Sequence, residues 1–301
     1  MSTNNNLTIG FVGLGMMGFP MARNLLNAGF FVQGYTLQEQ DRVRFAEAGG
    51  TLKPDAASAA RDVDIVITML PNGRIVREAV LGEKGIAEGM SPSALYIDMS
   101  TTHPMESDQL REDLAQKGLS MMDAPVGRTA AHAEKGTLLV LAGGTQDQLA
   151  QTAPIFAVLG EEVLDCGGPG MGIRVKLINN FMSISLNALS CEALTLCDAL
   201  GLPRELAIKV MQGTPAGKGH FTTTYPKKVF SGDVEPDFSL NLAHKDLGLA
   251  LDVANQLHIP LSMGAAAREM YSVARGRGLG PKDWTALLLS QEQFYNNQIN
   301  F

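Results

Sequence analysis

The chain carries the stretch LTIGFVGLGMMGFPMARNLLNAG from Leu7 to Gly29, and this stretch decides the fold. It opens with an apolar run typical of a buried strand, passes through Gly13, Gly15 and Gly18 in G-x-G-x-x-G spacing, and closes with an amphipathic helix. The first glycine permits a tight turn, the second lets the backbone approach a pyrophosphate, and the third lets helix and strand pack closely. Because the helix start also presents N–H groups and a positive dipole end, the sequence predicts a dinucleotide site here.

Further apolar runs rich in Val and Ile follow, alternating with helical patterns: FFVQGY, DIVITML, ALYIDMS, SMMDAP, TLLVLAGG and EEVLDC. This alternation is typical of βαβ units and predicts a Rossmann-type, doubly wound parallel sheet over residues 1–168. After the hinge-like GGPG at 167–170, apolar residues recur at helical spacing instead. We therefore expect an all-α domain over residues 169–301.

Composition excludes several classes of function. The net charge of −7 speaks against nucleic acid and anionic membrane surfaces as partners. The three cysteines form no CxxC pair and the five histidines no H-x-x-x-H pair, so neither a disulfide framework nor a metal site is expected. The opening MSTNNN lacks the features of a signal peptide, and no segment suits a membrane span. The cysteine pattern favours a reduced, cytoplasmic setting over a disulfide framework.

The choice of dinucleotide depends on the end of the second strand. An acidic residue usually accepts the adenosine ribose hydroxyls about 20 residues beyond the glycines, but this chain has Thr36. A hydroxyl binds a ribose without repelling a 2′-phosphate; Arg42 and Arg44 favour that phosphate, and Glu39 disfavours it. We predict NAD, used as NADH, and leave NADP open.

Two loops follow later strands, at the edge where open α/β sheets bind ligands. They are MLPNG at 69–73 and DMSTTHP at 98–104. We expect Leu70, Pro71 and Thr101 to face the nicotinamide half of the cofactor. The same residue types also serve ordinary turns and helix caps.

A polar stripe marks the helix that follows the hinge. On a helix Lys176, Asn179, Asn180 and Ser183 fall on one face, with apolar side chains around the remainder. A solvent-facing stripe usually carries Glu, Lys and Arg, so we interpret this one as the lining of a pocket. An ammonium framed by neutral hydrogen-bonding groups suits a proton donor, and Lys176 is predicted to be the general acid in reduction and the base in oxidation.

The loop DAPVGRTAA, residues 123–131, contains the other cation of interest. Arginine is forked and permanently charged, so Arg128 is a candidate clamp for the anionic end of a substrate. The alternative is an ordinary surface arginine.

Taken together, the glycine fingerprint, MLPNG, DMSTTHP, DAPV, GGPGMGIRVKLINN and HKDLG resemble the β-hydroxyacid dehydrogenase family, which includes 3-hydroxyisobutyrate dehydrogenases. The resemblance implies a Rossmann domain, a helical domain and assembly into homodimers or homotetramers. It matches Lys176 to the catalytic lysine and Lys245 to a second lysine near the cofactor and substrate. It also matches Met16 and Met17 to positions whose backbone meets the pyrophosphate.

One loop departs from the common pattern of that family. Most members read DAPVSGG where this chain reads DAPVGRT, and this variant resembles a branch that reduces a sulfonated aldehyde. The resemblance implies an NADH-dependent reductase of a small anionic aldehyde, with the sulfonate held by Arg128, Asn179 and Ser183. A carboxylate semialdehyde substrate and a non-catalytic dinucleotide-binding regulator are the alternatives.

Overall fold

The structure is a computed structural model and describes residues 7–298. The segment MSTNNN, in which no signal peptide is expected, lies outside the described residues. The chain divides into two compact units, which meet between Phe181 and Met182. The boundary predicted from sequence, between residues 168 and 169, precedes a long helix, whereas the division between the units falls within that helix.

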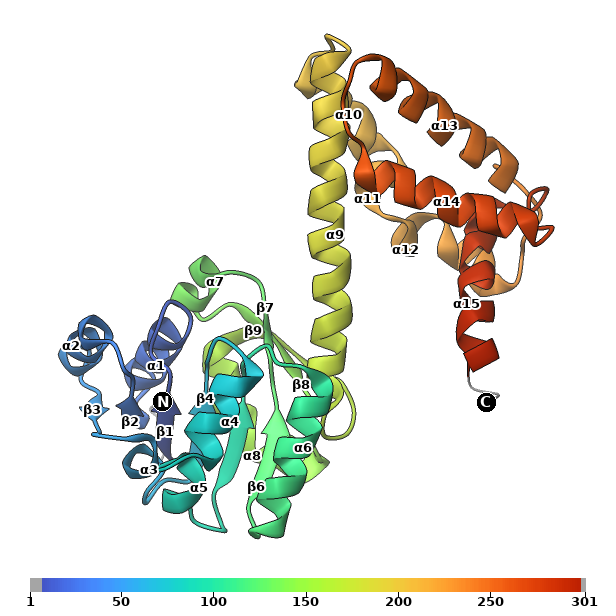
Figure 1. Ribbon diagram of the computed structural model, residues 1–301. Helices are drawn as coiled ribbons and strands as arrows, with labels where there is room; N and C mark the ends of the chain where they lie inside the picture. Colours follow the sequence, from blue (N-terminus) through green and yellow to red (C-terminus); the bar gives the residue numbers. More distant parts are fainter. Residues whose placement is uncertain (1–6, 299–301) are drawn as a thin grey trace. The chain divides into compact units, whose positions relative to one another are not determined.

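A six-stranded parallel sheet forms the centre of the first unit (Figure 1). Its strand order is β3-β2-β1-β4-β5-β6, which reverses direction on either side of β1, as in doubly wound folds. The bounds are β1 Thr8–Val12, β2 Phe31–Tyr35, β3 Thr51–Leu52, β4 Ile65–Thr68, β5 Leu95–Asp98 and β6 Ser120–Asp123. The predicted fold class is confirmed.

A smaller three-stranded sheet follows, in the order β7-β8-β9. Its strands are β7 Val126–Gly127, β8 Leu138–Ala142 and β9 Gly160–Asp165, with β7 antiparallel to β8 and β8 parallel to β9. The runs TLLVLAGG and EEVLDC were predicted as strands of one parallel sheet and instead lie in this separate, mixed sheet. The second sheet starts at the end of β6, where the backbones of Asp123 and Gly143 bond to each other, and β7 then pairs antiparallel with β8.

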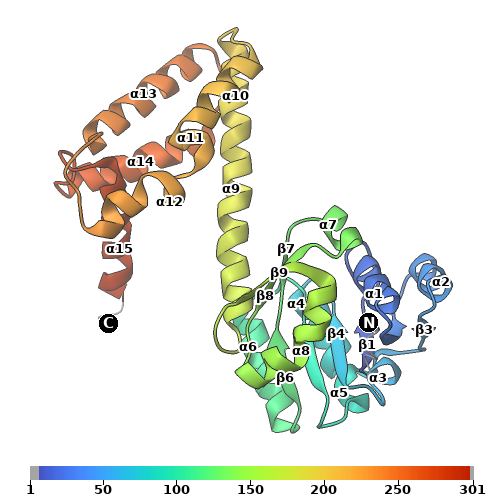
Figure 2. The same ribbon diagram turned by 180° about the vertical axis from the view of Figure 1, so that it is seen from behind.

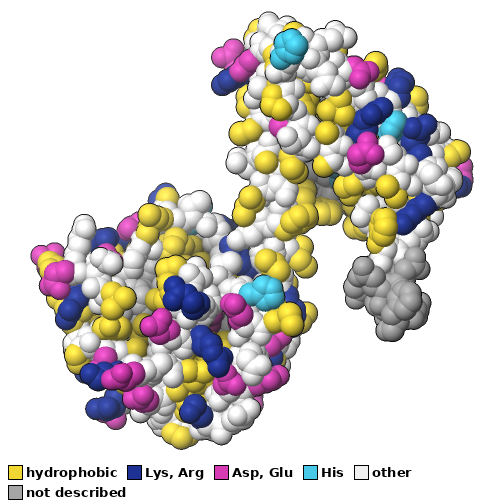
Figure 3. Space-filling view, in the orientation of Figure 1, with side chains coloured by type: hydrophobic (Ala, Val, Ile, Leu, Met, Phe, Trp, Pro, Cys, Tyr) yellow, Lys and Arg dark blue, Asp and Glu magenta, His cyan; other side chains and the backbone are white. Residues whose placement is uncertain are grey.

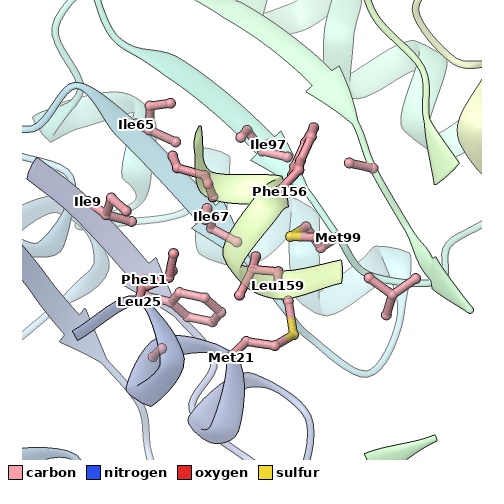
Figure 4. Packing of buried hydrophobic residues seen from close by; sticks show 14 of the residues in the cluster. Ile9, Phe11, Met21, Leu25, Ile65, Ile67, Ile97, Met99, Phe156 and Leu159 are labelled. Carbon is pink, nitrogen blue, oxygen red and sulfur yellow. The ribbon is translucent and has the colours of Figure 1, made fainter. Parts of the chain in front are cut away.

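Helices cover both faces of the large sheet, as the two opposite views show (Figures 1 and 2). On one face lie α1 Gly18–Asn27, α7 Ala130–Lys135 and α8 Gln146–Leu159. On the other lie α3 Ala56–Ala59, α4 Gly73–Leu81, α5 Ile86–Gly89 and α6 Pro104–Gln116, while α2 Glu39–Glu47 lies beside α1 and β3. Each face has its own apolar core, and Figure 4 shows the first, where Met21 and Leu25 of α1 and Phe156 of α8 pack against strand residues such as Ile67.

The second unit is built from helices. The helix α9 Met171–Ala199 crosses the division between the units. The remaining α-helices are α10 Arg204–Gly213, α11 Pro215–Lys218, α12 His220–Thr223, α13 Leu240–Gln256, α14 Ser262–Gly276 and α15 Leu287–Gln298, and short 3₁₀ helices span η1 Tyr225–Lys227, η2 Val229–Ser231 and η3 Trp284–Ala286. Among the residues described here no strand occurs after β9, and no helix is long and apolar enough to cross a membrane.

Candidate functional site

A cleft of about 960 Å³ opens at the carboxyl ends of β1, β2, β4 and β5. It is lined by nine of the residues predicted to bind the cofactor: Gly13, Gly15, Met16, Met17, Gly18, Thr36, Leu70, Pro71 and Thr101. They come from four separate segments of the chain. The parallel strand order brings these segments together, because β1 lies between β2 and β4, and β4 pairs with β5.

The glycine turn between β1 and α1 has the geometry that a pyrophosphate requires. Gly13 has φ +98°, a left-handed conformation that favours glycine, and its N–H donates to the carbonyl of Tyr35 at 2.9 Å. A Cβ added at Gly18 would lie 1.9 Å from the carbonyl oxygen of Gly13, whereas one added at Gly15 would meet no atom within 4 Å. The turn is therefore closely packed beneath Gly18 and open beside Gly15.

The start of α1 is available to an anion. Its N-cap residue is Met17, and no side chain caps the helix there. The first N–H groups of a helix have no partner inside the helix, and they favour negative charge. The open side of Gly15 leaves the backbone accessible from the cleft. These residues fit the diphosphate of a nicotinamide dinucleotide.

A buried hydrogen-bond network connects the two loops that are predicted to face the nicotinamide half of the cofactor. The Tyr96 hydroxyl lies 2.7 Å from Thr68 Oγ1, which donates to Asp98 Oδ1 at 2.9 Å. The same carboxylate oxygen accepts the N–H of Ser100 at 3.0 Å, and Ser100 Oγ accepts the N–H of Leu70 at 2.9 Å. The loop after β4 is thereby bonded to the loop after β5.

Burial is the main cause of the pKa shifts of the two titratable groups in this network, Asp98 and Tyr96. It raises the pKa of Asp98, although the hydrogen bonds from Ser100 and Thr68 act in the opposite direction, and it raises the pKa of Tyr96 far above its ordinary value. Sequence reasoning missed both residues. The position of Asp98 at the carboxyl end of an apolar strand was the available signal.

Lys176 lies in the second turn of α9 and is buried, with 8% of its surface exposed. Burial lowers the pKa of its ammonium group, because a low-polarity environment disfavours the charged form. The residue does not line the cleft itself. Its helix begins beside the end of β6, the strand that pairs with β5, so Lys176 belongs to the same edge of the sheet as the Thr101 loop.

The rest of the predicted stripe is less buried than Lys176. Asn179 is exposed and Asn180 half-buried, and their side chains bond to each other at 3.4 Å. Ser183 is exposed and belongs to the second unit. Lys245, also in the second unit, forms an ion pair with Asp246 at 2.8 Å, and its place near the cofactor stays a prediction.

Arg128 follows β7 in a left-handed conformation, φ +75°. Its guanidinium is paired with Glu161, reaches Glu162 at 4.0 Å and donates to the carbonyl of Thr137 at 2.7 Å. The predicted anion clamp thus binds carboxylates of its own chain. Sequence alone did not indicate this pairing, because Glu161 lies 33 residues further along the chain.

Comparison with known proteins connects this geometry to a family. Residues 8–168 match the family described as the NAD binding domain of 6-phosphogluconate dehydrogenase, and residues 170–290 match the one described as NAD-binding of NADP-dependent 3-hydroxyisobutyrate dehydrogenase. The chain belongs to the 3-hydroxyisobutyrate dehydrogenase family. The resemblance inferred from the motifs is confirmed.

Relatives within the 3-hydroxyisobutyrate dehydrogenase family align along nearly the whole chain. The 3-sulfolactaldehyde reductase of Escherichia coli (strain K12) is 56% identical over 280 residues, 93% of this chain and 94% of that protein. The human mitochondrial 3-hydroxyisobutyrate dehydrogenase is 31% identical over 307 residues, 100% of this chain and 90% of that protein. A solved structure of the Mycobacterium tuberculosis 3-hydroxyisobutyrate dehydrogenase with L-serine superposes with a TM-score of 0.66 at 28% identity, covering 95% of this chain and 99% of that one.

The family settles the class of activity. The chain is an NAD-binding oxidoreductase, because it matches both NAD-binding families and its relatives are dehydrogenases and reductases. The alternative of a non-catalytic regulator is therefore set aside. Within the part of the chain that the structure describes, no three His, Cys, Asp or Glu side chains are grouped to hold a metal ion.

Proposed function

We propose that this enzyme reduces 3-sulfolactaldehyde to 2,3-dihydroxypropane-1-sulfonate with NADH, as a step in sulfoquinovose degradation. The observation that carries the proposal is the 56% identity to the Escherichia coli 3-sulfolactaldehyde reductase over 93% of this chain. The cleft geometry supports the cofactor half of the reaction, because the glycine turn, Thr36 and the nicotinamide-side loops line one continuous space.

The chemistry divides between the cofactor and Lys176. The reduced nicotinamide ring, when bound, supplies the hydride to the carbonyl carbon. Lys176 donates a proton to the carbonyl oxygen, so that an alcohol rather than an alkoxide leaves the site. Its burial supports this role, because an ammonium with a lowered pKa gives up its proton more readily at neutral pH.

Arg128, Asn179 and Ser183 bind the anionic end of the substrate in this proposal, and Asn180 lies next to Asn179 on α9. A sulfonate keeps its charge at physiological pH and offers three acceptor oxygens, which suits a permanent guanidinium and neutral donors. To bind it, Arg128 exchanges its contact with Glu161 for one with the substrate.

A carboxylate semialdehyde, such as tartronate, succinate or methylmalonate semialdehyde, is the second candidate substrate. The observation that favours it is that Arg128 already pairs with carboxylates in this structure. The two candidates share the fold, the cofactor and the role of Lys176, so they differ only in the anion at the far end of the aldehyde.

Nicotinamide absorbance assays separate these candidates. We expect kcat/KM with 3-sulfolactaldehyde to exceed that with each carboxylate semialdehyde, and kcat/KM with NADH to exceed that with NADPH. A carboxylate substrate preferred by about tenfold, or some 1.4 kcal/mol of transition-state stabilisation, would end the sulfonate assignment. Comparable efficiency with NADPH would end the preference for NADH.

Lys176→Ala tests the proton donor in the same assay. We expect kcat to fall by about 10²- to 10⁴-fold, the usual contribution of a general acid, with NADH affinity unchanged. Asn187→Ala, a polar exchange further along the same helix, is the control and should retain activity. A Lys176→Ala enzyme that keeps most of its kcat excludes the role.

We further infer that the enzyme assembles as a homodimer or homotetramer in the cytoplasm. Large apolar side chains of α9 lie at the surface, among them Ile178 and Phe181 in the first unit and Ile184 in the second. Figure 3 shows hydrophobic side chains spread over this exposed surface. Large apolar side chains exposed along one helix often mark a protein–protein interface. Sedimentation of Ile178→Asp against the wild type tests this, and a monomeric wild type contradicts it.

A further inference from the structure

Asp123 is a buried carboxylate at the end of β6, with 3% of its surface exposed. Its two oxygens bind the start of α9, the helix that carries Lys176. Oδ1 accepts the N–H of Gly170 at 2.5 Å, and Oδ2 accepts the N–H of Ile173 at 2.7 Å. Each oxygen therefore satisfies one of the N–H groups that a helix start leaves without an internal partner. A negative charge at this end also complements the helix dipole.

The carboxylate lies close against two glycines. A Cβ added at Gly143 would lie 2.7 and 2.9 Å from the two carboxylate oxygens, and one added at Gly172 would lie 2.9 Å from Oδ2. The backbone of Asp123 is bonded in both directions to that of Gly143, at 3.2 and 2.7 Å. Both the main chain and the side chain of Asp123 are thus held in place.

The outer side of the same helix turn is held by a different contact. Arg174 donates to Asp108 Oδ2 at 2.5 Å and to the carbonyl of Gly170 at 2.7 Å. This pair lies nearer the surface, with side chains 41% and 24% exposed, whereas Asp123 is buried. Screening by water makes the exposed pair the weaker constraint. The buried carboxylate therefore determines how the start of α9 is rotated about its axis.

That rotation decides where the ammonium of Lys176 lies. Lys176 follows Ile173 by three residues, which is less than one turn of helix. Each residue turns a helix by about 100°. If a neighbouring residue replaced Ile173 as the donor to Asp123, the helix would rotate by that angle and Lys176 would point to a different side. Smaller shifts also matter, because a displacement of about 1 Å at a reacting group can lower a rate by about 100-fold.

We propose that Asp123 is a positioning residue for proton transfer, which acts by binding the N–H groups of Gly170 and Ile173 and so directing Lys176 at the substrate oxygen. The inference rests on the proposed role of Lys176. Asp123 itself does not touch the substrate in this account. It sets the place from which the proton is delivered.

The test is Asp123→Asn in the full-length enzyme. An amide offers one acceptor oxygen and one NH₂ group, so either Gly170 or Ile173 loses its acceptor and faces a donor instead. We expect kcat per folded molecule to fall by about 10- to 100-fold, while KM for the aldehyde and the dissociation constant of NADH change by less than about twofold. Fluorescence titration with NADH counts the folded molecules.

A solvent isotope effect on kcat distinguishes positioning from a merely structural role. A misdirected proton makes proton transfer more rate-limiting, so the effect of D₂O should be larger in Asp123→Asn than in the wild type. Loss of folded protein removes molecules without changing the step in those that remain. An unchanged isotope effect together with wild-type kcat per folded molecule would overturn the proposal.

The matched control is Asp283→Asn in the second unit. Asp283 is also a fully buried carboxylate that accepts backbone N–H groups, from Asp237 at 3.2 Å and Thr285 at 3.0 Å. Its exchange should lower the melting temperature without altering the isotope effect. If the isotope effect rises equally in this variant, the proposal is overturned.

A second variant covers the case in which Asp123→Asn does not fold. Gly143→Ala keeps the carboxylate but crowds both of its oxygens and the N–H of Gly172, and should show the same selective loss of kcat. Failure of the proposed function is recognised separately. If Lys176→Ala retains kcat, the proton donor is wrong; if Lys176→Ala is inactive while both Asp123→Asn and Gly143→Ala keep wild-type kcat and isotope effect, only the positioning role is wrong.

Discussion

Replacing Gly18 by alanine should lower the stability of the first unit, and this loss of stability, rather than a change in the catalysed reaction, is its primary effect. The added Cβ would lie 1.9 Å from the carbonyl oxygen of Gly13 and 3.1 Å from the ring of Phe11. Neither neighbour can move aside easily, because the first is backbone and the second is a fully buried ring. Overpacking costs about 1–3 kcal/mol, and these rigid neighbours place Gly18→Ala near 3 kcal/mol. For a unit of this size that corresponds to a melting temperature lower by about 6–12 °C.

Gly15→Ala is the matched control and should show the opposite pattern. Its added Cβ would meet no atom within 4 Å, and Gly15 is not among the glycines with positive φ. The fold should therefore tolerate it. The methyl group would nevertheless stand in the cleft where the pyrophosphate approaches the backbone. We expect NADH to bind at least about tenfold more weakly, or some 1.4 kcal/mol.

Calorimetric melts without cofactor and fluorescence titrations with NADH measure the two effects independently. The reasoning is refuted if Gly18→Ala melts together with the wild type, since the turn would then not be closely packed beneath α1. It is equally refuted if Gly15→Ala binds NADH as the wild type does, because the open side of the turn would then not face the cofactor.

The remaining predictions concern the two cations. Burial lowers the pKa of Lys176 from its ordinary value of 10.5, and reduction needs the protonated form of this lysine. The kcat for reduction should therefore fall as pH rises through a midpoint below 10.5, while the kcat for alcohol oxidation rises through the same midpoint. A pH profile that stays flat up to pH 10.5 contradicts a lysine donor. Glu161→Gln releases Arg128 from a partly exposed ion pair worth up to about 1 kcal/mol, so KM for 3-sulfolactaldehyde should fall by up to about fivefold. Glu162→Gln, whose carboxylate lies 4.0 Å from the guanidinium, should have a smaller effect, and equal KM values in both variants and the wild type would remove Arg128 from anion binding.

Much of the fold was predictable from local pattern. Parallel strands that are covered by helices on both faces appear in the sequence as short runs rich in Val and Ile. Each of the seven apolar runs predicted to be strands does contain one. The strands that were missed, β3 Thr51–Leu52 and β7 Val126–Gly127, have two residues each and show no periodicity. The antiparallel pairing of β7 depends on where β6 ends and β8 passes, which is a tertiary property.

The residues of the candidate site also fall into two groups, those that a local sequence pattern predicts and those whose contacts come from distant segments. The nine predicted cofactor residues that line the cleft follow local rules, namely a glycine fingerprint and loops that follow strands. The partner of Arg128 and the role of Asp123 depend on segments 33 and 47 residues away, which no motif reports. In the sequence, Asp123 is only the first residue of the loop DAPVGRTAA. Its function as a helix cap emerges once β6 and the start of α9 lie side by side.

The Tyr96–Thr68–Asp98–Ser100 network makes the cofactor site modular. It bonds the loop after β4 and the loop after β5 to each other and to the sheet interior. Among the residues described, Thr36, which is predicted to bind the adenosine ribose, has no hydrogen bond to this network. We therefore expect substitutions at Thr36 to alter which dinucleotide is accepted while the two loops keep their hydrogen bonds, so that a change of redox pool would leave the part of the cleft predicted to hold the nicotinamide unaltered.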